Sequence, residues 1–298
     1  MTDAATHSSN SIDTTISQLA SMACLLEVSA PKPGNVHRGA DFDDMTFDDF
    51  LLSSIMVGPA LGAASAVGVG QSVLSAIEAR CSVTAANTNL GLVLLIAPLA
   101  AVPADLPLRQ GIGQVLSQLT SEDCRLVYQA IRLASPGGLG EQDDMDVHET
   151  PPDDLLAAMA AASDRDLIAR QYSNQFEDLL ASFVPWLVEE ANSADSLSQA
   201  IVRFHVRIMA AHPDSLIQRK CGLAIAEQSA ALAAGVLNAA DTATYHEKLA
   251  ELDFWLRADH NRRNPGTTAD MVGASLFAAL RDKQLELSSA KDDQVEIS

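Results

Sequence analysis

Four loops of this 298-residue chain gather side chains of the types that bind phosphates or metal ions in proteins. In the first, residues 30–38, Lys32 lies between two prolines and is followed by His37 and Arg38. Prolines hold the backbone extended, and Gly34 permits a turn or a close approach to a ligand. The loop is therefore either a phosphate-binding loop or a rigid turn between helices.

The second loop, residues 87–91, precedes a strongly apolar segment. Thr88 or Asn89 suits the N-cap of a helix there, because a side-chain oxygen can accept a hydrogen bond from the first turn. The N-terminus of a helix also attracts anions. Asn87, Thr88 and Asn89 are therefore candidate substrate-binding residues, with simple capping as the alternative.

The third loop contains three carboxylates in four residues, Asp143, Asp144 and Asp146, after a glycine-rich stretch. Such carboxylates repel one another unless they are solvated or bridged by a cation. The segment is thus either an exposed acidic loop or part of a cation site.

The fourth loop, residues 262–270, combines two arginines with a turn and the start of the last predicted helix. Thr267 and Thr268 can cap that helix, and Asp270 falls in its first turn. Asp214 lies at another predicted helix start. We predict that Asp214 and Asp270 are metal ligands or an acid–base pair, with two ordinary helix-start aspartates as the alternative.

Two basic positions complete the candidate site. Neighbouring residues on a helix point about 100° apart, so we expect only one of Arg219 and Lys220 to face a site that includes Asp214. We predict Arg219, because its forked guanidinium suits phosphate oxygens. For Lys32 we predict contact with a substrate phosphate. Together the loops supply the parts of a phosphate-plus-metal site.

The elements that position these loops are predicted to be helices. The chain is 48% hydrophobic but only 4% aromatic, and alanine and leucine favour helices. Thr46 with Asp49, and Thr120 with Asp123, resemble capping boxes. No segment alternates like a strand. We predict one bundle-like all-α domain over residues 13–285, between polar tails at 1–12 and 286–298. The predicted helices span about residues 13–28, 46–67, 71–80, 89–101, 121–134, 153–162, 165–191 (bent near Pro185), 195–211, 215–238, 242–258 and 268–284.

The formal net charge of −20 argues against nucleic acid or an anionic membrane as a partner, since both require clustered cations. The four cysteines form no CxxC pair, which argues against a zinc site or a disulfide scaffold. The N-terminus does not resemble a signal peptide. The longest apolar stretches, around 51–69 and 90–104, are too interrupted by Gly, Pro and Ser to span a membrane. We expect a cytoplasmic protein that acts on small phosphorylated molecules. The sequence does not indicate its oligomeric state.

Four ordered motifs between about residues 20 and 280 resemble those of the triphosphoribosyl-dephospho-CoA synthase family. They are Glu27 with Pro31–Gly34, Gly39, Asp44-Met45, Phe50 and Ser53; Asn87-Thr88 with Gly91; Asp214–Arg219 with Gly222; and Leu252-Asp253 with Asn264–Asp270. Motifs found together in the family order are far more specific than any one of them.

The resemblance implies an all-helical enzyme that transfers the triphosphoribosyl part of ATP to an acceptor hydroxyl, with adenine leaving. It implies catalytic roles for Glu27, Asp214 and Asp270, and Mg²⁺ held by Asp44, Asp214 and Asp270. The implied substrate-binding residues are Lys32, Gly34, Asn35, Arg38, Asn87, Thr88, Asn89, Arg219, Asn264, Gly266, Thr267 and Thr268.

Three departures from the family pattern suggest a divergent branch. Asn89-Leu90 stands where the family commonly has His-Lys, Thr267-Thr268 replaces Gly-Ser, and the segment 135–146 is not part of the family signature. The alternative is therefore a phosphoribosyl-type transferase of tetrahydromethanopterin-like cofactor biosynthesis, with a different donor and acceptor. A terpenoid-type diphosphate enzyme fits less well, because the aspartates at 143–146 do not have its Asp-Asp-x-x-Asp spacing. A non-catalytic helical scaffold is a further alternative.

Overall fold

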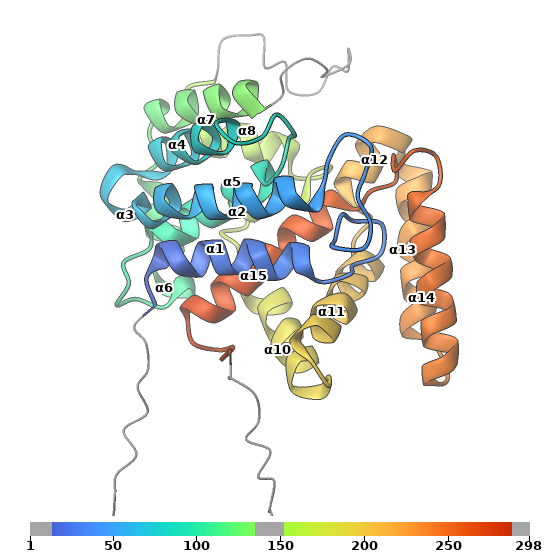
Figure 1. Ribbon diagram of the computed structural model, residues 1–298. Helices are drawn as coiled ribbons and strands as arrows, with labels where there is room; N and C mark the ends of the chain where they lie inside the picture. Colours follow the sequence, from blue (N-terminus) through green and yellow to red (C-terminus); the bar gives the residue numbers. More distant parts are fainter. Residues whose placement is uncertain (1–13, 135–151, 288–298) are drawn as a thin grey trace, which may run out of the picture.

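The computed structural model describes residues 14–134 and 152–287. Over these residues the chain folds as an array of helices without a sheet, and an isolated bridge joins His37 to Ala40 (Figure 1). The predicted all-α class is confirmed. The predicted tails and the cluster Asp143, Asp144 and Asp146 fall largely or wholly outside the described residues. Among the described helices, none is long and apolar enough to cross a membrane.

The first half of the chain forms helices that run one after another with short connections. They are α1 (Ile16–Ser29), α2 (Phe47–Gly62), α3 (Ala64–Val67), α4 (Val69–Cys81), α5 (Leu90–Ala101), α6 (Leu108–Ser117) and α7 (Ser121–Ala134).

The second half contains shorter helices and one π-helical segment. They are α8 (Leu155–Ala162), α9 (Leu167–Ser173), the π-helix η1 (Leu179–Phe183), α10 (Val184–Ser193), α11 (Leu197–Ala211), α12 (Ser215–Cys221), α13 (Leu223–Leu237), α14 (Thr242–Arg257) and α15 (Gly266–Arg281).

Both predicted capping boxes are confirmed. The Asp49 amide donates to Thr46 Oγ1 (3.3 Å) and the Thr46 amide donates to Asp49 Oδ2 (2.8 Å) at the start of α2. Thr120 and Asp123 make the same exchange before α7, at 3.2 and 2.9 Å. Each pair satisfies two backbone donors that a helix start otherwise leaves unpaired.

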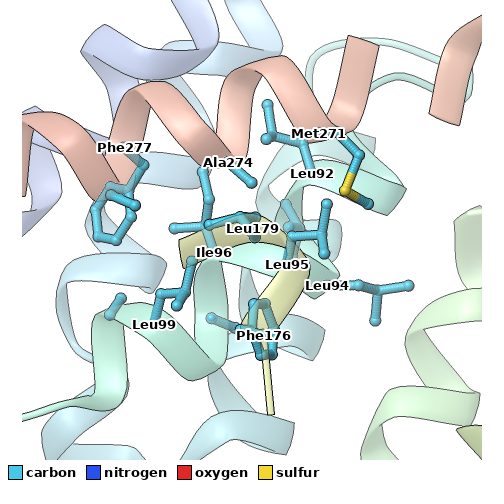
Figure 2. Close-up of a cluster of buried hydrophobic side chains, with 14 of the residues drawn as sticks. Leu92, Leu94, Leu95, Ile96, Leu99, Phe176, Leu179, Met271, Ala274 and Phe277 are labelled. Carbon is cyan, nitrogen blue, oxygen red and sulfur yellow. The ribbon is translucent and has the colours of Figure 1, made fainter. Parts of the chain in front are cut away.

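The core lies around α5 and α15, which are apolar on nearly all sides and pack against each other. A helix without a polar face must be buried, and these two are. Figure 2 shows Leu92 and Ile96 beside Met271, Ala274 and Phe277 in this cluster. The N-terminal ends of both central helices therefore have fixed positions inside the molecule.

A second, smaller core joins α11 and α12 to the hairpin of α13 and α14, which stands at one side of the molecule (Figure 1). Ile217 of α12 and Leu256 of α14 are wholly buried in it. This core holds the C-terminal end of α14 near the loop that follows α1.

Three predicted helices need correction, and one helix was missed. The helix predicted over 46–67 is divided at Ala63 into α2 and α3. The helix predicted over 165–191 is broken at Gln175 and Phe176, whose φ angles are 57° and 61°, and Pro185 lies harmlessly in the first turn of α10. The helix predicted over 215–238 is divided at Gly222, with φ 89°. Helix α6 was missed because it contains Gly111 and Gly113, which weaken helix propensity.

Candidate functional site

Lys32 is wholly buried at the C-terminal end of α1. Its ammonium pairs with Glu27 Oε1 (2.9 Å) and donates to the Glu27 carbonyl and, at 3.4 Å, to the Ala30 carbonyl. An ammonium has three donors, and all three are occupied here. The geometry therefore does not favour the predicted phosphate contact. Lys32 caps α1 and holds Glu27 in place.

The loop that carries Lys32 is clamped by the last turn of α14. The Gly34 amide donates to Asp253 Oδ1 (2.7 Å), and Arg257 binds both Asp253 (2.9 Å) and the Asn35 carbonyl (2.7 Å). Gly34 has φ 74°, and a Cβ there would lie 2.7 Å from Leu256 Cβ. This position therefore requires glycine for both its backbone angle and its close packing.

Asp253 and Arg257 were not predicted as site residues. Their spacing of four on a helix predicts an ion pair, but not the contact with a loop more than 200 residues earlier. A further bond, from Asn35 Nδ2 to Asn264 Oδ1 (2.8 Å), ties the same loop to the segment before α15. The first and last motifs thus meet in space.

Asp214 is buried and caps two helices at once. Its Oδ1 accepts from the amides of Leu216 (2.9 Å) and Ile217 (3.0 Å) in α12. Its Oδ2 accepts from the amide (2.7 Å) and the hydroxyl (2.8 Å) of Thr268 in α15. Burial raises the pKa of Asp214, and these hydrogen bonds oppose the rise. The alternative reading of Asp214 as a helix cap is therefore the one that its contacts favour.

Asp270 is partly buried against the start of α5. A Cβ on Gly91 would lie 2.1 Å from Asp270 Oδ2, so only glycine permits this approach. Burial raises the pKa of Asp270 well above its usual range, and the negative charges of Glu27, Asp214 and Asp166 add to the rise. The Leu92 backbone amide acts in the opposite direction. Glu27, Asp214 and Asp270, the predicted catalytic trio, therefore lie near one another.

Several helix N-termini meet around Asp270. Asp166 caps α9 through the Ile168 amide (2.8 Å), and the Leu167 amide donates to Ser215 Oγ (3.0 Å) at the start of α12. Together with the Asp214 cap and the Asp270–Gly91 contact, these bonds bring the starts of α5, α9, α12 and α15 together. Helix N-termini carry partial positive charge and stabilise carboxylates and bound anions.

The second loop behaves differently from the prediction. Asn89, at φ 60°, precedes α5, but its side chain makes no capping bond and donates instead to Ser53 Oγ (2.7 Å). Thr88 is buried, and its hydroxyl lacks a partner among the described residues. Asn87 is exposed. The alternative interpretation of Thr88 or Asn89 as a side-chain N-cap is therefore wrong, and substrate binding by this loop stays a prediction.

A cavity of about 520 Å³, the cationic pocket, lies between the C-terminal end of α12 and the turn that follows α14. Its lining includes Arg219, Lys220, Arg262, Arg263 and Asp259. Arg262 is steadied by the Lys220 carbonyl (2.9 Å). Arg219 and Lys220 both line this pocket, whereas Asp214 does not, so the predicted choice of Arg219 for a site shared with Asp214 stays a prediction. Partial burial lowers the pKa of Lys220, and the positive charge of Arg219 lowers it to a smaller extent. The negative charges of Asp44 and Asp214 oppose the change.

A second cavity of about 390 Å³, the adjacent pocket, shares Lys220 and Arg262 with the first. Asp44 and Asn264 line it as well. The fourth loop indicates a basic segment at 262–263, but nothing local in it predicts that these arginines meet Arg219 and Lys220 in one cavity. Arg38 is exposed and lines neither cavity.

The predicted metal set is not assembled. Within residues 14–134 and 152–287, no three Asp, Glu, His or Cys side chains are placed to hold a metal ion. Asp44 lies near Lys220, whereas Asp270 lies at the start of α5. Of the remaining candidates, Thr267 is buried, and Gly266 packs against Leu216. A Cβ on Gly266 would lie 2.6 Å from Leu216 Cδ2.

Comparisons with known proteins agree with this arrangement. The sequence model of the ATP:dephospho-CoA triphosphoribosyl transferase family matches residues 13–289. A crystal structure described as a triphosphoribosyl-dephospho-CoA synthase from Archaeoglobus fulgidus has a similar fold, with TM-score 0.61 and 24% identity, covering 78% of this chain and 98% of that one. No curated protein matches. The chain therefore belongs to the ATP:dephospho-CoA triphosphoribosyl transferase family, and it is a transferase rather than a terpenoid-type enzyme or a scaffold.

Proposed function

We propose that this transferase moves the triphosphoribosyl group of ATP to a hydroxyl of dephospho-CoA or a similar acceptor, with the donor phosphates in the cationic pocket. The observation that carries the assignment is the gathering of four cationic side chains in one cavity of a chain with net charge −20. Of these four, only Arg262 has an ion-pair partner within the described residues, Asp259 at 3.6 Å. Arginine and lysine in such a setting suit a polyphosphate.

In this transfer, the bond between the anomeric carbon and adenine breaks, and its electron pair leaves with adenine. The acceptor oxygen forms the new bond to that carbon, and overall its proton is gained by adenine. We assign Asp270 as the group that first takes this proton, because its raised pKa makes it a better base than an ordinary carboxylate. Glu27, held by Lys32, supplies negative charge that stabilises a positive ribose ring.

We include Mg²⁺, an ATP donor and a cytoplasmic location in the proposal. The donor set fits a magnesium ion that needs one protein carboxylate, because Mg²⁺ is often held by one or two carboxylates together with substrate phosphates. Asp44, which lines the adjacent pocket beside Lys220, is that carboxylate. The ion would neutralise charge on the phosphates.

The test is to incubate the protein with ATP, dephospho-CoA and Mg²⁺ and to measure released adenine and the product by mass spectrometry. Phosphoribosyl diphosphate in place of ATP tests the alternative donor, for which released diphosphate is the signal. Adenine release that depends on acceptor supports the proposal. Diphosphate release alone would establish the alternative branch, and release from neither donor would refute the proposal.

The pocket assignment needs a variant that breaks no internal contact. Arg219→Gln meets this requirement, and we expect it to raise the donor KM by about 10- to 100-fold. Arg109→Gln is the matched control, because Arg109 is exposed, pairs with Glu177 and lines neither pocket. Equal donor KM values for the two variants would place the phosphates elsewhere.

A further inference from the structure

We propose that the adjacent pocket binds the purine base of a nucleotide whose phosphates occupy the cationic pocket; the proposal rests on the function assigned above. The two cavities share Lys220 and Arg262, so one extended ligand can occupy both. Their volumes, about 520 and 390 Å³, lie within the range of small-molecule sites.

The wall between the two cavities is an unusual turn. Asp259, His260 and Asn261 have φ angles of 62°, 54° and 58°. Three consecutive L-residues in this region are strained, although Asp, His and Asn tolerate it better than other types. Hydrogen bonds from the Arg262 amide to the Asp259 carbonyl (3.1 Å) and from the Asn264 amide to the Asn261 carbonyl (3.1 Å) fix the turn.

A turn that served only to reverse the chain would be built more easily with glycine. Here each left-handed position carries a polar side chain that lines a cavity instead. Asp259 lines the cationic pocket, whereas His260 and Asn261 line the adjacent one. Strain retained at such positions indicates that the side chains themselves are used.

The chemistry of the adjacent pocket suits a heteroaromatic base. Phe42 and Met45 contribute apolar surface, and the exposed His260 contributes an aromatic ring. Asn261 and Asn264 contribute amides, which can pair with donors and acceptors on the edge of a base. The Asn264 oxygen is taken by Asn35, so its NH₂ group is the part that faces a ligand.

The cationic pocket has a different lining, with Ile225 and Gln218 as its large apolar residue and its amide. Its lining contains no aromatic residue, and most of its polar groups are charged. A nucleotide placed with its phosphates there and its base beside His260 matches both cavities. The reverse placement would put a neutral ring among four cations. The shared chemistry is therefore adenine with 5′-phosphates, which both the donor and the acceptor of this family carry.

The backbone of the turn allows a clean test. Glycine adopts positive φ without strain, so His260→Gly and Asn261→Gly remove the side chains while preserving the turn, whereas alanine would leave the strain in place. Lys283→Gly is the matched control, because Lys283 has φ 55° but lines neither pocket. Titration calorimetry measures the Kd of ATP, dephospho-CoA and inorganic tripolyphosphate for each variant.

We expect His260→Gly and Asn261→Gly to weaken ATP binding by about tenfold, the scale of a lost stacking or base-edge contact, and to leave tripolyphosphate unchanged. Arg219→Gln should weaken ATP and tripolyphosphate alike. If the glycine variants bind dephospho-CoA more weakly but bind ATP as the wild type does, the base pocket is still supported. The purine base in it is then that of the acceptor.

Two results would overturn the inference in distinguishable ways. If the glycine variants bind every ligand as the wild type does, the base lies elsewhere while the phosphate pocket and the proposed function stand. If the wild type binds none of the three ligands, the proposed function fails and the base pocket fails with it. If circular dichroism shows that one glycine variant does not fold, the other variant provides the test. A lower ratio of ATP to tripolyphosphate affinity than in the wild type supports the base pocket, and an unchanged ratio contradicts it.

Discussion

The ammonium of Lys32 shows how a residue type can be identified correctly and its contact misjudged. The two prolines around it indicate a rigid loop, which the structure has, but they do not reveal that the side chain turns back to α1. A buried lysine is tolerated because Glu27 and two carbonyls satisfy it. Its role in the site is to position Glu27.

Replacing Lys32 by methionine preserves the length of the side chain and removes the charge. Because Glu27 would then be buried without its partner, we expect a loss of about 3–5 kcal/mol in unfolding free energy, measured by denaturant titration. The double variant Glu27→Gln with Lys32→Met should recover part of this loss. A stable Lys32→Met protein with weakened donor binding would instead support the predicted contact between Lys32 and a donor phosphate.

Asp214→Asn and Asp270→Asn should separate a cap from a catalytic carboxylate. An amide cannot accept on both sides as the Asp214 carboxylate does, so we expect a loss of about 1–3 kcal/mol in stability. At Asp270 we expect turnover to fall about a hundredfold while the melting temperature holds or rises. Turnover assays and thermal melts of both variants check this, and an active Asp270→Asn enzyme would remove Asp270 from catalysis.

The raised pKa of Asp270 also predicts how stability depends on pH. Its protonated form is favoured in the folded state, so the stabilisation is complete below the ordinary aspartate pKa of about 4 and is lost as pH rises through the folded pKa. Thermal melts of wild type and Asp270→Asn should therefore coincide at low pH. The variant should become the more stable of the two as pH increases, and a constant difference at all pH values would contradict the assignment.

At the scale of elements, the helices with local capping signals were predicted from the sequence. The breaks that depend on packing in the core were not. Thr46 and Thr120 cap their helices as expected. The break at Gln175 and Phe176 has no glycine or proline to signal it; the buried Phe176 ring accompanies a left-handed backbone that local propensity would not choose. The loops of the site were found individually, whereas their meeting depends on packing that no single segment encodes.

The break offers its own stability test. Gln175 is exposed at φ 57°, so Gln175→Gly should relieve strain and raise the unfolding free energy by about 1 kcal/mol. Gln175→Ala keeps the strain and is the matched control. Equal stability of the two variants in denaturant titration would show that the left-handed backbone costs nothing here.

At the scale of the whole molecule, the site is closed by contacts between its two ends. The bonds from Gly34 to Asp253 and from Asn35 to Asn264 join segments separated by 219 and 229 residues. Motif order in the sequence therefore says little about which motifs touch. The small core of α11–α14 fixes α14, and α14 in turn fixes the loop after α1.

Gly34→Ala tests this closure. A Cβ would meet Leu256 at 2.7 Å and Pro265 at 2.9 Å at an unfavourable φ, so we expect a loss of about 1–3 kcal/mol in stability and a larger loss of activity. Gly235→Ala is the control, since nothing lies within 4 Å of its Cβ in α13 and it should stabilise the helix by up to about 1 kcal/mol. Unaltered turnover in Gly34→Ala would separate the clamp from catalysis.

The double cap by Asp214 has a consequence for local opening. One carboxylate protects the amides of Leu216 and Ile217 in α12 and of Thr268 in α15, which are about 50 residues apart along the chain. The two helix starts should therefore open as a single cooperative unit, and these amides should exchange with deuterium at a common rate. In Asp214→Asn all three amides should lose protection together, although Thr268 lies 54 positions from Asp214 in the sequence.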